Sequence, residues 1–164
     1  VDLHMVPEAP IVDIGAGSSM MVDALLAHGF TNLTAMDIST AALARTRRRV
    51  GTAVDLVVAD VRDYVTDVPV ALWHDRAVFH FLVEEADRTK YRHNLHESLA
   101  AGGHAVIATF APDGPQMCSG LPAQRYSAEE LADVLDLRLE RSEQRDHVTP
   151  SGTTQPFTIA VLAH

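Results

Sequence analysis

Short apolar runs alternate along the chain with longer segments in which apolar residues recur at the spacing of a helix. The apolar runs predict strands at residues 9–14, 33–36, 54–59, 70–74, 104–110, 137–144 and 157–162. The longer segments predict helices at residues 20–27, 40–50, 84–100 and 127–135. Ser39 or Thr40 is suited to cap the second helix, and Gly51 to end it.

Because strands and helices take turns over most of the chain, the strands are expected to pair in parallel through helical crossovers. The last two predicted strands have no helix between them, which indicates antiparallel pairing at the edge of the sheet. No internal repeat or linker divides the sequence. We therefore expect one α/β domain, built as a three-layer sandwich.

The composition is that of an acidic globular protein. Its 164 residues include 13 basic and 22 acidic side chains, for a formal net charge of −9. Such a negative net charge disfavours a nucleic-acid partner. The basic run at residues 45–49 lies on a predicted helix, where we expect it to form a solvent-exposed face. No apolar run approaches the roughly 18 residues of a membrane span. The single cysteine, Cys118, fits a cytoplasmic protein.

The first residues look like a cloning remnant. The opening VDLHM has no initiator, so we expect Val1 to His4 to be an expression-vector remnant and the domain to span residues 5–164. The protein would then be a minimal core, without leading helices over its site. The loop from Ala111 to Tyr126 is the candidate lid, and we expect a solvent-exposed site of broad specificity.

The strongest motif follows the first strand, where IVDIGAGSS places Gly15 and Gly17 after an apolar run. Glycines there allow a tight turn and a close approach of the backbone to a ligand. Asp37 stands 37 − 15 = 22 positions beyond Gly15, at the end of the second strand, where a carboxylate can accept hydrogen bonds from ribose hydroxyls. The pair predicts a nucleoside site.

Two residues distinguish between the possible nucleosides. Met20 occupies the position of the third glycine that a dinucleotide pyrophosphate site favours. Asp13, two residues before Gly15, would repel a diphosphate but attract a cationic group. An adenosine with a sulfonium and ammonium tail fits this charge pattern better than NAD does.

The segments DIGAGSS, MDIS, VADVRD, WHDR and LAAGGHAVIATF together resemble a class I S-adenosylmethionine-dependent methyltransferase, from Ile11 to about Leu162. This resemblance implies a Rossmann-like, seven-stranded, mostly parallel sheet with an antiparallel last strand. It also implies S-adenosylmethionine as cofactor, with S-adenosylhomocysteine as its product. The residues that the resemblance assigns to the cofactor are Asp13, Gly15, Ala16, Gly17, Ser18, Asp37, Ile38, Asp60, Val61 and His74.

Within this set each group has an expected task. Gly15, Ala16 and Gly17 line the methionine tail, and Asp13 neutralises its ammonium. Asp37 with Ile38 holds the ribose, and Asp60 with Val61 frames the adenine. A turn cap is the alternative role for Asp60.

The end of the fourth strand, WHDRAVFHF, is where this fold presents the acceptor. The catalytic candidates there are His74, Asp75, Arg76 and His80. The two histidines are possible bases near neutral pH. The alternative to a base is that His74 only lines the wall of the pocket and that His80 lies on a helix at the surface. The alternative for Arg76 is an ion pair with Asp75, Glu84 or Glu85.

Methyltransferases that act on nucleic acid carry either an Asn/Asp-Pro-Pro-aromatic element or a nucleophilic cysteine after a proline. This sequence has neither at the expected place, so the acceptor is expected to be a small molecule or a protein. We expect a small-molecule thiol, hydroxyl or amine. WHDRAVFHFLVEEADRTKY is similar to the thiopurine and thiol S-methyltransferase branch, which implies Arg76 as a contact for an anionic or aromatic substrate.

No metal is expected, because His93 and His96 lack a third ligand. We expect a monomer or homodimer. The alternative function is a partner-dependent, non-catalytic cofactor-binding subunit.

Overall fold

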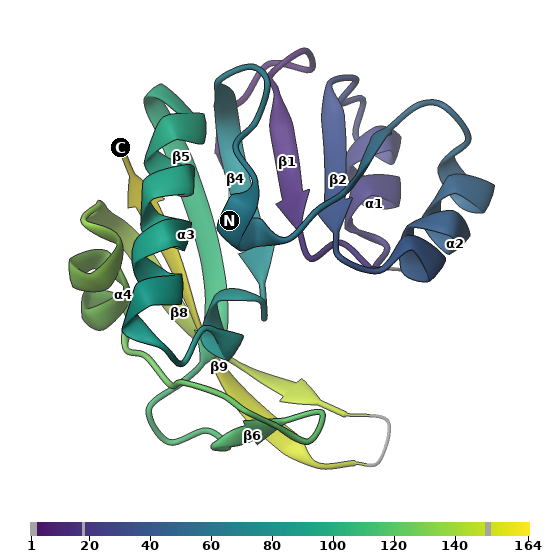
Figure 1. Ribbon diagram of the computed structural model, residues 1–164. Helices are drawn as coiled ribbons and strands as arrows, with labels where there is room; N and C mark the ends of the chain where they lie inside the picture. The colour runs from purple at the N-terminus through teal and green to yellow at the C-terminus, as the bar shows by residue number, and fades with distance from the viewer. Residues whose placement is uncertain (1–2, 18, 150–151) are drawn as a thin grey trace.

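The computed structural model describes residues 3–17, 19–149 and 152–164. Its main sheet has the strand order β3-β2-β1-β4-β5-β9-β8 (Figure 1). The strands span Ile11–Ile14 (β1), Leu33–Asp37 (β2), Asp55–Val58 (β3), Val70–Arg76 (β4), Leu99–Phe110 (β5), Arg138–Val148 (β8) and Thr154–Ala163 (β9). The first five pair in parallel, whereas β9 runs antiparallel to both β5 and β8. The predicted fold is confirmed.

Helices cover both faces of the sheet, as expected for a three-layer sandwich. α1 (Met21–Ala27) and α2 (Thr40–Val50) pack on one face, with Ile11, Leu33 and Leu72 in their shared core. α3 (Glu85–Ser98) and α4 (Ala128–Leu135) pack on the other, around Trp73 and Ile107. We call these the α1 face and the α3 face.

Shorter elements complete the chain. Two 3₁₀ turns, η1 (Val61–Asp63) and η2 (Phe79–Phe81), follow β3 and β4. Inside the expected loop after β5 lies a small hairpin of β6 (Met117–Cys118) and β7 (Leu121–Pro122). None of the described helices is long and apolar enough to cross a membrane.

One boundary differs from the prediction. The glycine pair at 102–103 was expected to stop a helix at Ala100, but α3 ends at Ser98 and the pair lies inside β5. A Cβ on Gly103 would lie 2.9 Å from the carbonyl oxygen of Ala100 and 3.0 Å from that of Val70. Glycine is therefore needed there for a close approach between β4 and β5, and not as a helix end.

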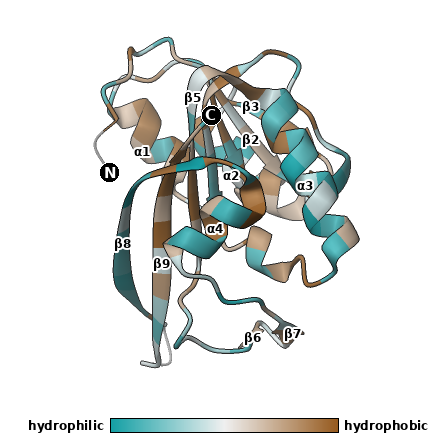
Figure 2. Ribbon diagram, turned by 90° about the vertical axis from the view of Figure 1, so that its left-hand side faces the viewer, coloured by the Kyte–Doolittle hydropathy of each residue, from teal (hydrophilic) through white to brown (hydrophobic). Residues whose placement is uncertain are grey.

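The edge strand β8 is longer than predicted, because it continues to Val148 and not only to residue 144. Figure 2 shows it hydrophilic along its length, whereas β9 beside it is largely hydrophobic. Its charged side chains alternate in sign and are mostly exposed. Charge on an edge strand discourages pairing with a further chain, and here it also places polar groups beside the site described next.

Candidate functional site

The glycine turn after β1 is held by the loop that follows β4. Gly15 and Gly17 adopt positive φ angles of 63° and 51°, which other residues rarely tolerate. A Cβ on Gly15 would overlap Cγ2 of Val78, two residues beyond the end of β4. The sequence therefore needs glycine at 15 both for its backbone angle and for contact between the two loops. Ser18 lies outside the described residues.

Asp37 closes this turn from the neighbouring strand. The backbone N–H of Gly17 donates to Oδ2 of Asp37 at 2.7 Å, and that of Ser39 donates to Oδ1 at 2.7 Å. The carboxylate is only partly buried. Ile38 beside it is 70% exposed, which is unusual for a large apolar side chain and leaves an uncovered apolar surface next to the carboxylate.

Asp60 caps a turn, which was the alternative that its sequence position left open. Its carboxylate accepts hydrogen bonds from the backbone N–H of Arg62 at 2.9 Å and from the guanidinium of the same residue at 2.6 and 2.9 Å. The hydrogen bond from Arg62 holds the pKa of Asp60 below its usual range. The side chain of Val61 lies in the core. These three hydrogen bonds leave the Asp60 carboxylate able to accept a further hydrogen bond.

Asp13 and His74 form a close pair across the sheet. The parallel register of β1 and β4 sets these two residues opposite each other. Nδ1 of His74 lies 2.7 Å from Oδ1 of Asp13, whose other oxygen accepts a hydrogen bond from Ser19 Oγ at 3.4 Å. Asp13 is 3% exposed. An ionised carboxylate only accepts, so Nδ1 carries a proton, and in the neutral ring Nε2 is then an acceptor.

Asp75 is a correction to the expected site. Successive strand residues point to opposite faces, so Asp75 lies on the α3 face, away from His74. It is fully buried and accepts hydrogen bonds from Tyr91 Oη at 2.6 Å and from the backbone N–H groups of Val78 and Phe79. Burial raises the pKa of Asp75 to about 6, against these hydrogen bonds. Its role is to hold the turn after β4 in place, and the prediction that it contacts the acceptor is wrong.

His80 is the second correction. It is fully buried, so neither contact with an acceptor nor the alternative of a surface helix position holds. Its ring packs against the rings of Phe81 and Phe110, with centroids 4.5 and 4.7 Å away. Neither ring nitrogen has a hydrogen-bond partner among the described residues. Burial lowers the pKa of His80 to about 4, so the ring is neutral at physiological pH.

Asp75 and His80 predict opposite pH dependences of stability. The folded pKa of Asp75, about 6, exceeds its unfolded value, so its stabilisation is present below about pH 4 and is lost as the pH rises through 6. The folded pKa of His80, about 4, lies below its unfolded value, so its stabilisation is present above about pH 6.5 and is lost as the pH falls towards 4. Each change amounts to about 3 kcal/mol, and the two nearly cancel between pH 4 and 6.

Urea unfolding of single variants separates the two effects. Relative to the wild type, Asp75→Asn should gain about 3 kcal/mol in free energy of unfolding as the pH rises from 4 to 6.5, and His80→Leu should lose about as much. Asp55→Asn, at an exposed position on β3, is the control and should follow the wild type. Differences that stay constant with pH in both variants would contradict the two assignments.

Arg76 does not form the ion pair that was its alternative role. It ends β4, and its Nη2 lies 3.4 Å from Nδ1 of His147 on β8. Its guanidinium carbon lies 5.8 Å from the centroid of the Phe157 ring. No carboxylate of the described residues pairs with it. His147 therefore lies beside the candidate site.

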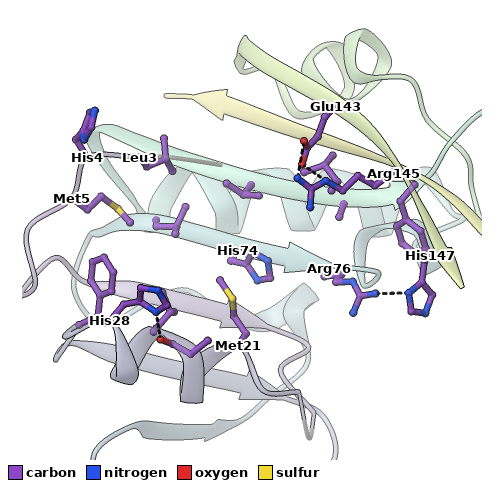
Figure 3. Close-up of a pocket in the computed structure, with 18 of the residues that line it drawn as sticks. Leu3, His4, Met5, Met21, His28, His74, Arg76, Glu143, Arg145 and His147 are labelled. Carbon is purple, nitrogen blue, oxygen red and sulfur yellow. Dashed lines mark hydrogen bonds and ion pairs between the residues drawn. The ribbon is translucent and has the colours of Figure 1, made fainter. Parts of the chain in front are cut away.

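A groove of about 840 Å³ runs across the α1 face and joins His74 to Arg76 (Figure 3). Leu72, Val106 and Ile159 lie on its strand floor. One end is lined by Leu3, Met5 and His28, and the other by Arg76, Arg145 and His147. The sequence pattern does not predict the contributions of β8, because they depend on the position of an edge strand.

Comparison with known proteins identifies the family. The methyltransferase-domain family matches residues 11–103, more than half of the chain, and the chain therefore belongs to it. The predicted enzyme class, a methyltransferase, is confirmed. No protein with a curated description matches the sequence.

Solved structures support the fold. A SAM-dependent methyltransferase from Methanosarcina mazei is 14% identical with a TM-score of 0.79, covering 98% of this chain and 94% of that one. The 1,6-didemethyltoxoflavin-N1-methyltransferase of Burkholderia thailandensis, bound to S-adenosylhomocysteine, is 21% identical with a TM-score of 0.75, covering 95% and 71%. The N-methyltransferase NodS of Bradyrhizobium japonicum, also with S-adenosylhomocysteine, is 16% identical with a TM-score of 0.75, covering 95% and 78%.

Proposed function

We propose that this protein transfers a methyl group from S-adenosylmethionine to a small-molecule acceptor. Its donor is S-adenosylmethionine, the cofactor that the sequence predicts, and two similar structures hold the product S-adenosylhomocysteine. The observation that carries the proposal is the contact of Asp37, at the end of β2, with the backbone N–H of Gly17 in the turn after β1. This contact joins the groups proposed for the ribose and for the methionine tail.

The chemistry of the residues around this contact fits the donor. Each oxygen of Asp37 already accepts one backbone N–H and has capacity left for a ribose hydroxyl. The exposed Ile38 offers an apolar contact to the nucleoside. The acidic Asp13, beneath the glycine turn, suits the cationic tail. The donor set that we propose consists of Asp13, Gly15, Ala16, Gly17, Ser18, Asp37, Ile38, Asp60, Val61 and His74.

When bound, the donor supplies a methyl group on a positively charged sulfur, and in-line displacement leaves the carbon–sulfur electron pair on sulfur. The chain's task is to align the acceptor and to exclude water. His74 is placed to take the proton of a hydroxyl or amine at Nε2, while Asp13 holds its Nδ1–H. A thiolate, the acceptor suggested by the thiol-methyltransferase resemblance, would need no base. The His74 pair therefore favours an oxygen or nitrogen acceptor.

Calorimetric titration with S-adenosylhomocysteine, with NAD as the control ligand, tests the donor site. We expect a Kd in the micromolar range for S-adenosylhomocysteine and no binding of NAD, because the acid at Asp13 disfavours a diphosphate. Binding of NAD instead would contradict the proposal. Donor binding without transfer to any thiol, hydroxyl or amine acceptor would favour the alternative of a partner-dependent, non-catalytic subunit.

A further inference from the structure

A chain of hydrogen bonds is buried on the α3 face, between β4 and α3. The indole Nε1–H of Trp73 donates to Tyr91 Oη at 2.9 Å, and the Tyr91 hydroxyl donates to Oδ2 of Asp75 at 2.6 Å. All three side chains are fully buried, and we call them the buried network. An ionised carboxylate is costly to bury, so packing alone does not explain an acid at position 75.

The Asp75 carboxylate holds the turn that follows β4. Its Oδ1 accepts from the backbone N–H of Val78 at 2.9 Å, and its Oδ2 accepts from that of Phe79 at 3.1 Å. Ala77, which precedes them, has a φ of 68°, in the left-handed region that favours glycine. Because a residue with a Cβ is strained there, the turn depends on surrounding bonds such as those to Asp75 to keep its shape.

Val78 connects this turn to the glycine turn after β1. Its Cγ2 fills the space into which a Cβ on Gly15 would point. The other end of the glycine turn is held by different elements, since Thr46 Oγ1 of α2 donates to the carbonyl of Gly17 at 3.0 Å and Asp37 of β2 accepts its N–H. Gly15 therefore depends on the loop after β4, whereas Gly17 depends on β2 and α2.

We propose that the buried network positions Gly15 for the amino-acid tail of the donor, and that it acts through Val78. The inference rests on the proposed methyltransferase function, in which Gly15 lines the tail and Asp37 holds the ribose. The members of the network are positioning residues, because they are fully buried on the α3 face and reach the glycine turn only through the loop after β4. The network therefore sets the affinity for the tail and leaves that for the nucleoside unchanged.

Two ligands separate the tail from the nucleoside. 5′-Methylthioadenosine has the adenosine and thioether of S-adenosylhomocysteine but lacks its amino-acid tail. In calorimetric titrations the wild type should bind S-adenosylhomocysteine about 10-fold or more tightly, because the charged tail adds charge-assisted hydrogen bonds. Tyr91→Phe keeps the ring and removes the hydroxyl that orients Asp75. We expect it to weaken S-adenosylhomocysteine about 3- to 10-fold and to change 5′-methylthioadenosine by less than about twofold.

Val78→Ala tests the route of this effect. It shortens the side chain that contacts Gly15, so it should also weaken S-adenosylhomocysteine selectively. In the double variant with Tyr91→Phe the two losses should not add, because both act on one contact. Tyr126→Phe is the matched control, since Tyr126 is buried in the same core but takes no part in the network. It should bind both ligands as the wild type does, and urea unfolding verifies that each variant is folded.

The indole signal of Trp73 gives a second readout, which needs no substitution. Trp73 is the single tryptophan of the chain, so its indole ¹H–¹⁵N signal is assigned without ambiguity. Because coupling between sites is reciprocal, S-adenosylhomocysteine should shift this signal more than 5′-methylthioadenosine does.

Several outcomes would overturn the inference. They are equal affinities of the wild type for the two ligands, equal indole shifts with both, unchanged or equally weakened binding of both in folded Tyr91→Phe, and additive losses in the double variant. Failure of S-adenosylhomocysteine to bind the wild type would instead refute the proposed function.

Discussion

Replacing Asp37 by asparagine is expected to weaken the binding of S-adenosylhomocysteine by about 100-fold. The carboxylate has two oxygens that each hold a backbone N–H at 2.7 Å and can each accept a ribose hydroxyl as well. Asparagine keeps one oxygen and replaces the other by a donor, which faces the N–H of Gly17 or Ser39. Loss of one to two charge-assisted hydrogen bonds, at roughly 1.5–3 kcal/mol each, gives a decrease of this size.

Calorimetric titration measures this effect directly. The matched control is Asp55→Asn, because Asp55 lies at the opposite end of the adjacent strand β3 and is exposed. Thermal unfolding of both variants shows whether the glycine turn survives. A Kd for Asp37→Asn within threefold of the wild type, in a folded protein, would show that Asp37 does not contact the ribose.

The sequence predicts the glycine turn after β1 and the position of Asp37 at the end of β2, because the determinants of both are local. Glycines at positive φ and an aspartate ending an apolar strand are recognisable within a few residues, as Gly15 and Asp37 show. The alternation of strands and helices likewise determines the order of crossovers, and so the sheet. These features need no knowledge of distant contacts.

The acceptor side depends on contacts that a sequence does not display. Asp13 and His74 are 61 residues apart, and Arg76 and His147 are 71 apart. The first pair follows from the register of two parallel strands, and the second from the place of an edge strand beyond β9. Neither register nor the reach of a long edge strand can be deduced from apolar periodicity alone.

The prediction that Asp75 shares a site with His74 could have been avoided from the sequence alone. His74 and Asp75 are adjacent on a strand, so they point to opposite faces, and both cannot line the same groove. Alternation groups Leu72, His74 and Arg76 on one face, and Trp73 with Asp75 on the other. The alternation of strand residues does not predict that Tyr91, from the middle of α3, donates a hydrogen bond to the buried Asp75 carboxylate.

His74→Gln is expected to lower kcat for a hydroxyl or amine acceptor by about 100- to 10,000-fold, the usual contribution of a general base. Glutamine fills a similar volume but cannot take a proton at neutral pH. His28→Gln is the matched control, because His28 lines the same groove at its other end. A thiol acceptor, which reacts as its thiolate, should be methylated by His74→Gln at nearly the wild-type rate when S-adenosylmethionine is saturating.

The partner carboxylate gives a second test of the same idea. In Asp13→Asn the side-chain amide donates to Nδ1 of His74, which moves the ring proton to Nε2 and removes the acceptor that faces the groove. At saturating S-adenosylmethionine, we therefore expect Asp13→Asn to lose activity with the same hydroxyl and amine acceptors as His74→Gln. If both variants slow hydroxyl and thiol acceptors equally, His74 shapes the groove and is not a base, because only proton removal distinguishes the two acceptors.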